Sequence, residues 1–285
     1  MKDNKKHKKA EYGILITGLI ILLAAACIIA LCAGQYSVSV PEVIKILASR
    51  FVNVTKTWSN TAEGVVFTLR LPRIIGAVLV GSALSLSGAA YQGVFKNPLV
   101  APDLLGVSSG ACVGASVAIL LHLNSFGVQA MAFVAGILAV GLTLFIPRLI
   151  KNTNMTMLVL SGIIVKGIMD SVMGIIKYVA DPETELQSIT YWQLGSLTKV
   201  LPKDLFTVGP VIVAASVIIF LLRWRINILS LGDREAKTLG VSVTVVRNFI
   251  IICATLLTAS AVCISGTIGW IGLVIPHFAR MLTGP

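Results

Sequence analysis

The sequence predicts an all-α fold, a polytopic bundle of about eight helices that cross a membrane. Of its 285 residues, 56% are hydrophobic and only 12% are charged, whereas soluble domains carry about 45–50% apolar and about 25% charged residues. The apolar residues are gathered in runs of roughly 20, the length with which a helix crosses a hydrocarbon core about 30 Å thick. The cationic residues lie mostly in the short segments between these runs. These observations argue against a soluble enzyme and favour a multi-pass membrane protein.

The first apolar run, residues 13–34, follows a basic tail, residues 1–12, that contains five lysines. A basic start before an apolar core is also typical of a signal peptide, but the core of such a peptide has only about 7–15 residues. We therefore expect this run to stay in the membrane as the first helix. The remaining predicted spans are residues 74–95, 104–121, 127–147, 155–179, 205–222, 249–268 and, shorter and more polar, 266–282.

The distribution of Lys and Arg predicts the orientation of these helices. If the basic tail lies in the cytoplasm and the spans alternate, the cationic short loops fall on the cytoplasmic side, as the positive-inside rule requires. We therefore expect a cell-membrane protein with a cytoplasmic N-terminus and a single transmembrane domain over residues 13–285, surrounded by lipid. The net charge of +11 then reflects topology, and no nucleic-acid partner is expected. The cations placed inside are Lys96, Arg148, Lys151, Arg223, Arg225, Arg234, Lys237, Arg247 and Arg280.

Several kinds of chemistry have no support in the sequence. There is no GxxxxGK[ST] loop, so the chain lacks the P-loop that holds nucleotide phosphates. His7, His122 and His277 do not have the spacing of metal ligands. The five cysteines lie inside apolar runs, and their odd number argues against a disulfide framework. We expect no enzymatic activity, no cofactor and no metal site, so the energy for any transport would come from a partner subunit or an ion gradient.

The motif Arg70-Leu71-Pro72-Arg73 lies on the predicted outer side, directly before the second span. Two outer arginines run against the positive-inside trend. Their guanidinium groups could meet lipid phosphates while Pro72 begins the helix. Alternatively, a rigid cationic pair could receive carboxylates of an external partner.

A second motif, residues 92–110, connects the second and third spans on the predicted cytoplasmic side. Asn97-Pro98 and Pro102 should end one helix, and Gly106 should open the next. We therefore expect a connection with a defined shape.

A third motif, residues 231–241, lies in a predicted cytoplasmic loop at about residues 226–245. Its composition predicts a short helix with alternating charges that ends at Gly240. It is either a solvated turn or a lever for a soluble motor subunit.

In their order along the chain, these motifs resemble those of FecCD-type permeases, the membrane subunits of ABC importers for iron–siderophores, haem and cobalamin. The resemblance extends from the first span to the last residue. It rests on Arg70 and Arg73, Gln92, Asn97-Pro98, Gly106, Trp192 with Gly195-Ser196, residues 231–241, and Pro276, His277 and Arg280.

The resemblance implies partners and sites. Members of the family work as two permease subunits with a cytoplasmic ABC ATPase dimer and an extracytoplasmic substrate-binding protein. Arg70 and Arg73 would then receive acidic residues of the binding protein. Met155 and Thr156 would form an inner gate on the translocation path. The ATPase would contact the third motif through Asp233, Arg234, Glu235, Ala236, Leu239 and Gly240.

The fifth span carries a charged face that the family pattern does not require. Lys166 and Asp170 are four residues apart, and Met155 and Lys177 lie within about 20° of Lys166 around a helix. An ionisable group at membrane depth costs at least about 2.5 kcal/mol, so this face should meet a partner or a wet cavity. The face is either a neutralised pair inside the bundle or part of a path for a polar chelate.

The expected function is import of an iron–siderophore or a related metal chelate by an ABC permease. Haem and cobalamin are alternative substrates, and an ion-driven secondary transporter that uses Lys166 and Asp170 is the alternative from another class. Family members continue beyond the last motif, so the resemblance implies a truncated chain that lacks the last two of about ten spans, or about 40 apolar residues.

Overall fold

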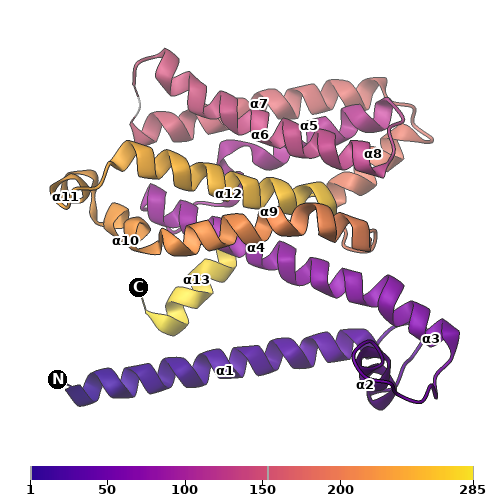
Figure 1. Cartoon of the computed structure of the whole chain (residues 1–285). Helices are drawn as coiled ribbons and strands as arrows, with labels where there is room; N and C mark the ends of the chain where they lie inside the picture. The colour runs from indigo at the N-terminus through magenta and orange to yellow at the C-terminus, as the bar shows by residue number, and fades with distance from the viewer. Residues whose placement is uncertain (1, 153, 285) are drawn as a thin grey trace.

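A computed structural model describes residues 2–152 and 154–284, and every regular element within these ranges is helical (Figure 1). The predicted all-α fold is thus confirmed. The first and last residues of the predicted tail and domain, 1 and 285, lie outside the described residues. The elements are α1 (Lys2–Cys32), α2 (Val40–Ala48), α3 (Asn60–Gly64), the π-helix η1 (Val65–Arg70), α4 (Leu71–Phe95), the 3₁₀-helix η2 (Pro102–Leu105), α5 (Val107–Leu120), α6 (Ser125–Leu149), α7 (Met155–Val179), α8 (Glu185–Leu194), α9 (Pro202–Leu221), α10 (Arg223–Leu231), α11 (Asp233–Thr238), α12 (Val243–Ser265) and α13 (Ile271–Thr283).

Each of the eight predicted spans has a helical counterpart. Among the described residues, 6 helices are long and apolar enough to cross a membrane, and α5 and α13 are shorter apolar helices. With 14 residues, α5 rises only about 21 Å, because the first part of the predicted third span is occupied by η2.

The second span begins earlier than predicted. The helix runs without interruption from Asn60 to Phe95, so residues 60–73, which precede the predicted second span, are also helical. Ser59 begins it, because its side chain accepts a hydrogen bond from the backbone N–H of Ala62. The prediction was wrong because Pro72 was interpreted as a helix start. A proline crowds the preceding turn of an α-helix, and here that turn is the wider π-helix η1.

The centre of the bundle is α12, which packs against α4, α5, α6 and α9 (Figure 1). Hydroxyl groups join it to α4. Ser87 Oγ lies 2.8 Å from Thr258 Oγ1 and donates to the carbonyl oxygen of Ala254 at 3.0 Å, while Tyr91 Oη lies 3.0 Å from Thr255 Oγ1. Interhelical hydrogen bonds of this kind stabilise membrane bundles where hydrophobic burial between helices contributes little.

The short helix η2 is wedged between α7 and α13. A Cβ atom at Gly162 of α7 would overlap the carbonyl oxygen of Leu104, and a Cβ atom at Gly272 of α13 would overlap the ring of Pro102. The two glycines therefore permit a close approach that any side chain would prevent.

Hydrogen bonds hold the η2 segment in this position. Thr143 Oγ1 on α6 donates to the carbonyl oxygen of Leu105 at 3.0 Å. Gln92 Nε2 on α4 donates to the carbonyl oxygens of Val100 and Leu273, at 3.3 Å each. One glutamine side chain thus connects α4, the segment before η2 and α13.

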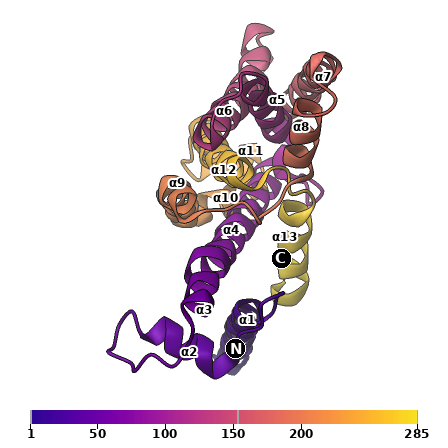
Figure 2. The ribbon, with the colours of Figure 1, turned by 90° about the vertical axis from the view of Figure 1, so that its right-hand side faces the viewer.

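The N-terminal helix lies apart from the α5–α7 group (Figure 2). Its C-terminal end packs with α2, α3 and η1 in a separate apolar cluster that includes Leu31, Ile46 and Trp58. Most of the remaining described side chains of α1 are exposed, as expected for a helix that faces lipid.

We predict that Gly162→Ala destabilises the bundle by about 1–3 kcal/mol, because the added methyl group must displace the backbone of η2. Gly167→Ala, on the same helix, is the matched control, since a Cβ atom at this position would meet no neighbouring atom within 4 Å. Thermal unfolding in detergent measures both. Equal unfolding temperatures for the two variants would contradict the proposed close contact.

Candidate functional site

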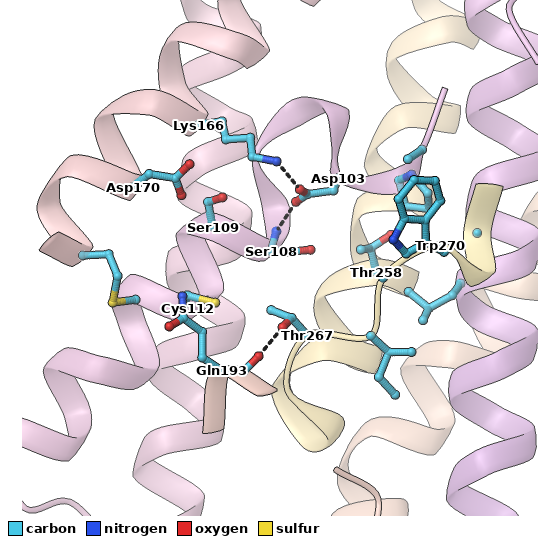
Figure 3. Close-up of a pocket in the computed structure, with 17 residues that line it drawn as sticks. Asp103, Ser108, Ser109, Cys112, Lys166, Asp170, Gln193, Thr258, Thr267 and Trp270 are labelled. Atoms are coloured by element: carbon cyan, nitrogen blue, oxygen red, sulfur yellow. Dashed lines mark hydrogen bonds and ion pairs between the residues drawn. The ribbon is translucent and has the colours of Figure 1, made fainter. Parts of the chain in front are cut away.

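An open cavity of about 320 Å³ lies between η2, α5, α7 and the segment that joins α12 to α13 (Figure 3). Its wall combines apolar side chains with a group of polar ones, although the surrounding helices are largely apolar. The polar and aromatic side chains that line it are Asp103, Ser108, Ser109, Lys166, Asp170, Gln193, Thr258, Thr267 and Trp270.

An ion pair crosses this cavity. Lys166 Nζ on α7 lies 2.9 Å from Asp103 Oδ2 on η2. The other carboxylate oxygen of Asp103 accepts a hydrogen bond from the backbone N–H of Ser108 at 3.1 Å, in the first turn of α5. The side chains of Lys166 and Asp103 remain 47% and 33% exposed, so the pair is open to the cavity and is not sealed in the core.

The structure corrects the expected partner of Lys166. The lysine does not pair with Asp170 within its own helix, because η2 reaches α7 at Gly162 and brings Asp103 closer. Asp170 lines the same cavity and forms no ion pair with the side chains described in residues 12–152 and 154–284. Lys177 lies about two turns after Asp170 on α7. Its Nζ donates to Gln193 Oε1 at 2.5 Å.

Asp103 does not stand out in the sequence as a site residue. Its one local signal is its position three residues before Gly106, which turns the chain into α5 with a φ of 80°. An acidic side chain at that place is typical of a helix N-terminus.

The predicted gate lies away from the cavity. Met155 and Thr156 begin α7, where Asn154 Oδ1 accepts a hydrogen bond from the backbone N–H of Met157 at 2.7 Å. Lys166 is 11 residues later, or about 16 Å along the helix. The residues predicted to form the gate and the ion pair therefore share a helix but not a cavity.

The other motif residues lie around η2 and stabilise its surroundings. Arg280 donates to Gln92 Oε1, and Pro276 is buried against the bundle. Asn97 Oδ1 accepts from the backbone N–H of Leu99 at 2.9 Å, in a turn that precedes Val100. His277 and Pro98 are exposed.

The short helix predicted within residues 231–241 is present as α11, at the end of the bundle that also holds α10 (Figure 1). Gly232 and Gly240, with φ of 147° and 75°, lie on either side of it. Ala236 is fully buried, so this side of the helix packs against the bundle. The remaining predicted contact residues are exposed or half-exposed: Asp233, Arg234, Glu235, Leu239 and Gly240.

Asp233 anchors α11 to two long helices. Its carboxylate accepts hydrogen bonds from Arg247 on α12, at 2.8 and 2.9 Å, and from Lys96 at the end of α4, at 3.1 Å. Burial raises the pKa of the Asp233 carboxyl, but the hydrogen bonds from Arg247 and Lys96 outweigh it and hold the pKa below its ordinary value of 3.8. Neither cationic partner of Asp233 was predicted from the sequence.

Arg70 and Arg73 lie near the opposite end of the molecule, where η1 continues into α4 (Figure 1). The Arg70 guanidinium donates to the carbonyl oxygen of Leu31 at 2.6 Å, to that of Cys32 at 3.2 Å, and to that of Tyr36. It therefore satisfies carbonyl groups at the C-terminus of α1. Arg73 is half-buried.

We predict that Asp233→Asn loosens α11. Because the pKa of Asp233 is lowered in the folded protein, the carboxylate stabilises this region above pH 3.8, and the stabilisation is lost as the pH falls through the lowered pKa. Hydrogen exchange of the amides of residues 233–241 at neutral pH should therefore be faster in Asp233→Asn. Lys237→Gln, on the exposed side of α11, is the control. Unchanged exchange in Asp233→Asn would rule out the anchoring role.

Comparison with known proteins identifies the family. The model of the FecCD transport family matches residues 21–285. The chain is 37% identical over 275 residues to the molybdate import system permease protein of Haemophilus influenzae, covering 96% of this chain and 81% of that protein. It is 41% identical over 220 residues to the "probable iron chelatin transport system permease protein" of Helicobacter pylori, covering 77% of this chain and 66% of that protein.

A solved structure agrees with this result. The fold is similar, with a TM-score of 0.85 and 34% identity, to a solved structure described as "an inward-facing conformation of a putative metal-chelate type ABC transporter"; 96% of this chain and 83% of the other are covered. Membership in an importer family decides against the ion-driven transporter. The chain belongs to the FecCD transport family, whose permeases lack an ATPase domain, and is a multi-pass membrane protein, the permease subunit of an ABC importer.

Proposed function

We propose that this permease translocates an iron–siderophore or a related metal chelate, and that the cavity crossed by Lys166 and Asp103 lies on the path. The observation that carries the proposal is a charged, open cavity between apolar helices. Charged groups at membrane depth are costly and typically mark a water-filled passage or a substrate site. The second carboxylate, Asp170, adds a polar group that a bound chelate could contact.

The substrate class rests on the relatives. The name of the Helicobacter pylori relative refers to an iron chelatin, and the similar solved structure is of the metal-chelate type. The Haemophilus influenzae relative carries molybdate, which makes this oxyanion the competing substrate. Haem and cobalamin remain alternatives within the family.

The proposed assembly contains a second permease subunit, a cytoplasmic ATPase dimer and an extracytoplasmic binding protein. We place the N-terminus and α11 in the cytoplasm, where Arg234 and the exposed Leu239 would meet the ATPase. Arg70 and Arg73 would receive the binding protein at the other end. Since the Arg70 guanidinium already holds three carbonyl oxygens, Arg73 would make the more direct contact.

The gate proposal concerns the first turn of α7. Met155 and Thr156 would close the path on the cytoplasmic side, about three turns from Lys166. Movement of α11 on ATP binding would reach them through the bundle, because Asp233 ties α11 to both α4 and α12.

Contact with the ATPase is tested by co-purification from cells that express all subunits. We predict that Leu239→Asp lowers the recovered ATPase by roughly tenfold, since a charge in an apolar contact costs more than about 1.4 kcal/mol. Leu123→Asp, an exposed leucine beside α5 at the other end of the bundle, is the control. If both variants retain the ATPase fully, α11 is not the docking site.

The path is tested by uptake of radiolabelled ferric siderophore, haem, cobalamin and molybdate into proteoliposomes that contain the full importer. We predict that only the ferric chelate accumulates and that Lys166→Leu lowers its uptake by roughly tenfold, because the variant leaves Asp103 unpaired in the cavity. Lys203→Leu, exposed at the start of α9, is the control. Unchanged uptake and affinity in Lys166→Leu would show that the ion pair is only structural.

A further inference from the structure

One carboxylate on α11 binds two cationic residues that differ in burial. Asp233 accepts hydrogen bonds from Arg247 at 2.8 and 2.9 Å and from Lys96 at 3.1 Å. The side chain of Arg247 is 13% exposed, whereas that of Lys96 is 35% exposed. Charge-assisted hydrogen bonds are stronger where less water competes for them. The contact with Lys96 is therefore the one that breaks more easily.

The guanidinium of Arg247 holds this carboxylate with only one of its nitrogen atoms. Nη2 donates to both carboxylate oxygens. The Nε N–H, which lies on the same edge of the guanidinium, is buried and has no acceptor within residues 12–152 and 154–284. A guanidinium typically binds a carboxylate through two parallel N–H···O bonds, and a buried donor without a partner is unfavourable. A small shift of Asp233 towards Nε would therefore gain a hydrogen bond.

Lys96 ends α4 in an unusual backbone conformation. Its φ is 52°, in the left-handed region where glycine or asparagine usually follows a helix. Asn97 and Pro98 come directly after it, and the chain then enters η2, which carries Asp103. Lys96 is thus seven residues before the carboxylate of the polar cavity. Its contact with Asp233 connects α11 to the segment that leads to that cavity.

We propose that Arg247 and Lys96 position α11 in different steps of the transport cycle. When the ATP-bound ATPase engages α11, Asp233 moves by about 1–2 Å, a displacement typical of helices in switching proteins. It then binds both Nε and Nη2 of Arg247 and releases Lys96. Arg247 keeps α11 attached to α12, while the end of α4 is free to move with the segment before η2. The exchange rests on the proposed docking of the ATPase at α11, because that contact displaces Asp233.

Carbodiimide treatment of the full importer tests the exchange, because this reagent joins a carboxylate to an amine in direct contact. Without nucleotide, mass spectrometry of the digest should detect an isopeptide bond between residues 96 and 233. With β,γ-imido-ATP and Mg²⁺, this product should fall roughly tenfold, which corresponds to about 1.4 kcal/mol. The product of Lys56 and Glu63, 2.7 Å apart beside α3 at the other end of the molecule (Figure 1), is the reference that should not change.

Two variants separate positioning from a structural role. In Arg247→Gln, which lacks the charged two-donor edge, Asp233 should stay on Lys96, so the 96–233 product should persist with the nucleotide. If Arg247 only stabilised α11, the variant would lower the product equally in both states. Lys96→Met should raise ATP hydrolysis without the binding protein roughly two- to fivefold, the effect of one partly exposed ion pair on a two-state equilibrium. Lys96→Arg, which keeps the charge, should not.

The exchange is overturned if the 96–233 product is absent without nucleotide, or if it is equally abundant in both states while the ATPase stays bound. Unchanged ATP hydrolysis in Lys96→Met would also overturn it. Full retention of the ATPase by Leu239→Asp is a different result, because it would refute the docking at α11 and the exchange with it. An unchanged 96–233 product in an importer that loses its ATPase in Leu239→Asp would refute the exchange alone.

Discussion

The close approach of η2 to α7 and α13 is the contact on which the rest of the site depends. Gly162 and Gly272 remove the side chains that would otherwise keep this short helix at the normal distance between helices. Because η2 lies so deep, Asp103 reaches Lys166, the carbonyl oxygen of Leu105 reaches Thr143, and the polar cavity forms beside them. A larger residue at either glycine would push the carboxylate out of the membrane interior and leave the lysine without its partner.

The longest continuous helix connects the two ends of the molecule. From Asn60 to Phe95, it begins beside the α1–α2 cluster, carries Arg70 and Arg73, contacts α12 through hydroxyl groups, and ends where Lys96 meets Asp233. Asp233 also binds Arg247 at the start of α12. The short helix α11 is therefore tied to the two helices at the centre of the bundle, so that a displacement of α11 must be transmitted to one of them or break an ion pair.

The sequence allowed most of the fold to be predicted, because hydrophobic runs and helix-ending residues are local signals. The spans, the turn at Asn97-Pro98 and the helix before Gly240 were all found in this way. What could not be predicted are contacts that depend on tertiary structure. Lys166 has a possible acidic partner four residues away, and only the glycine contact at 162 makes Asp103, 63 residues away, the actual one. Likewise, Lys96 and Arg247 were assigned to loops, and nothing in their local sequence links either to Asp233.

The position of η2 and the shape of the polar cavity depend on the pairing of Asp103 with Lys166. Carbodiimide treatment of the purified importer joins a carboxylate to an amine in direct contact, and mass spectrometry of the digest identifies the two residues. With Lys166 Nζ 2.9 Å from Asp103 Oδ2, we predict an isopeptide bond between residues 103 and 166 that persists in Asp170→Asn and disappears in Asp103→Asn. A cross-link from Lys166 to Asp170 in place of Asp103 would contradict the position of η2 and, with it, the shape of the cavity.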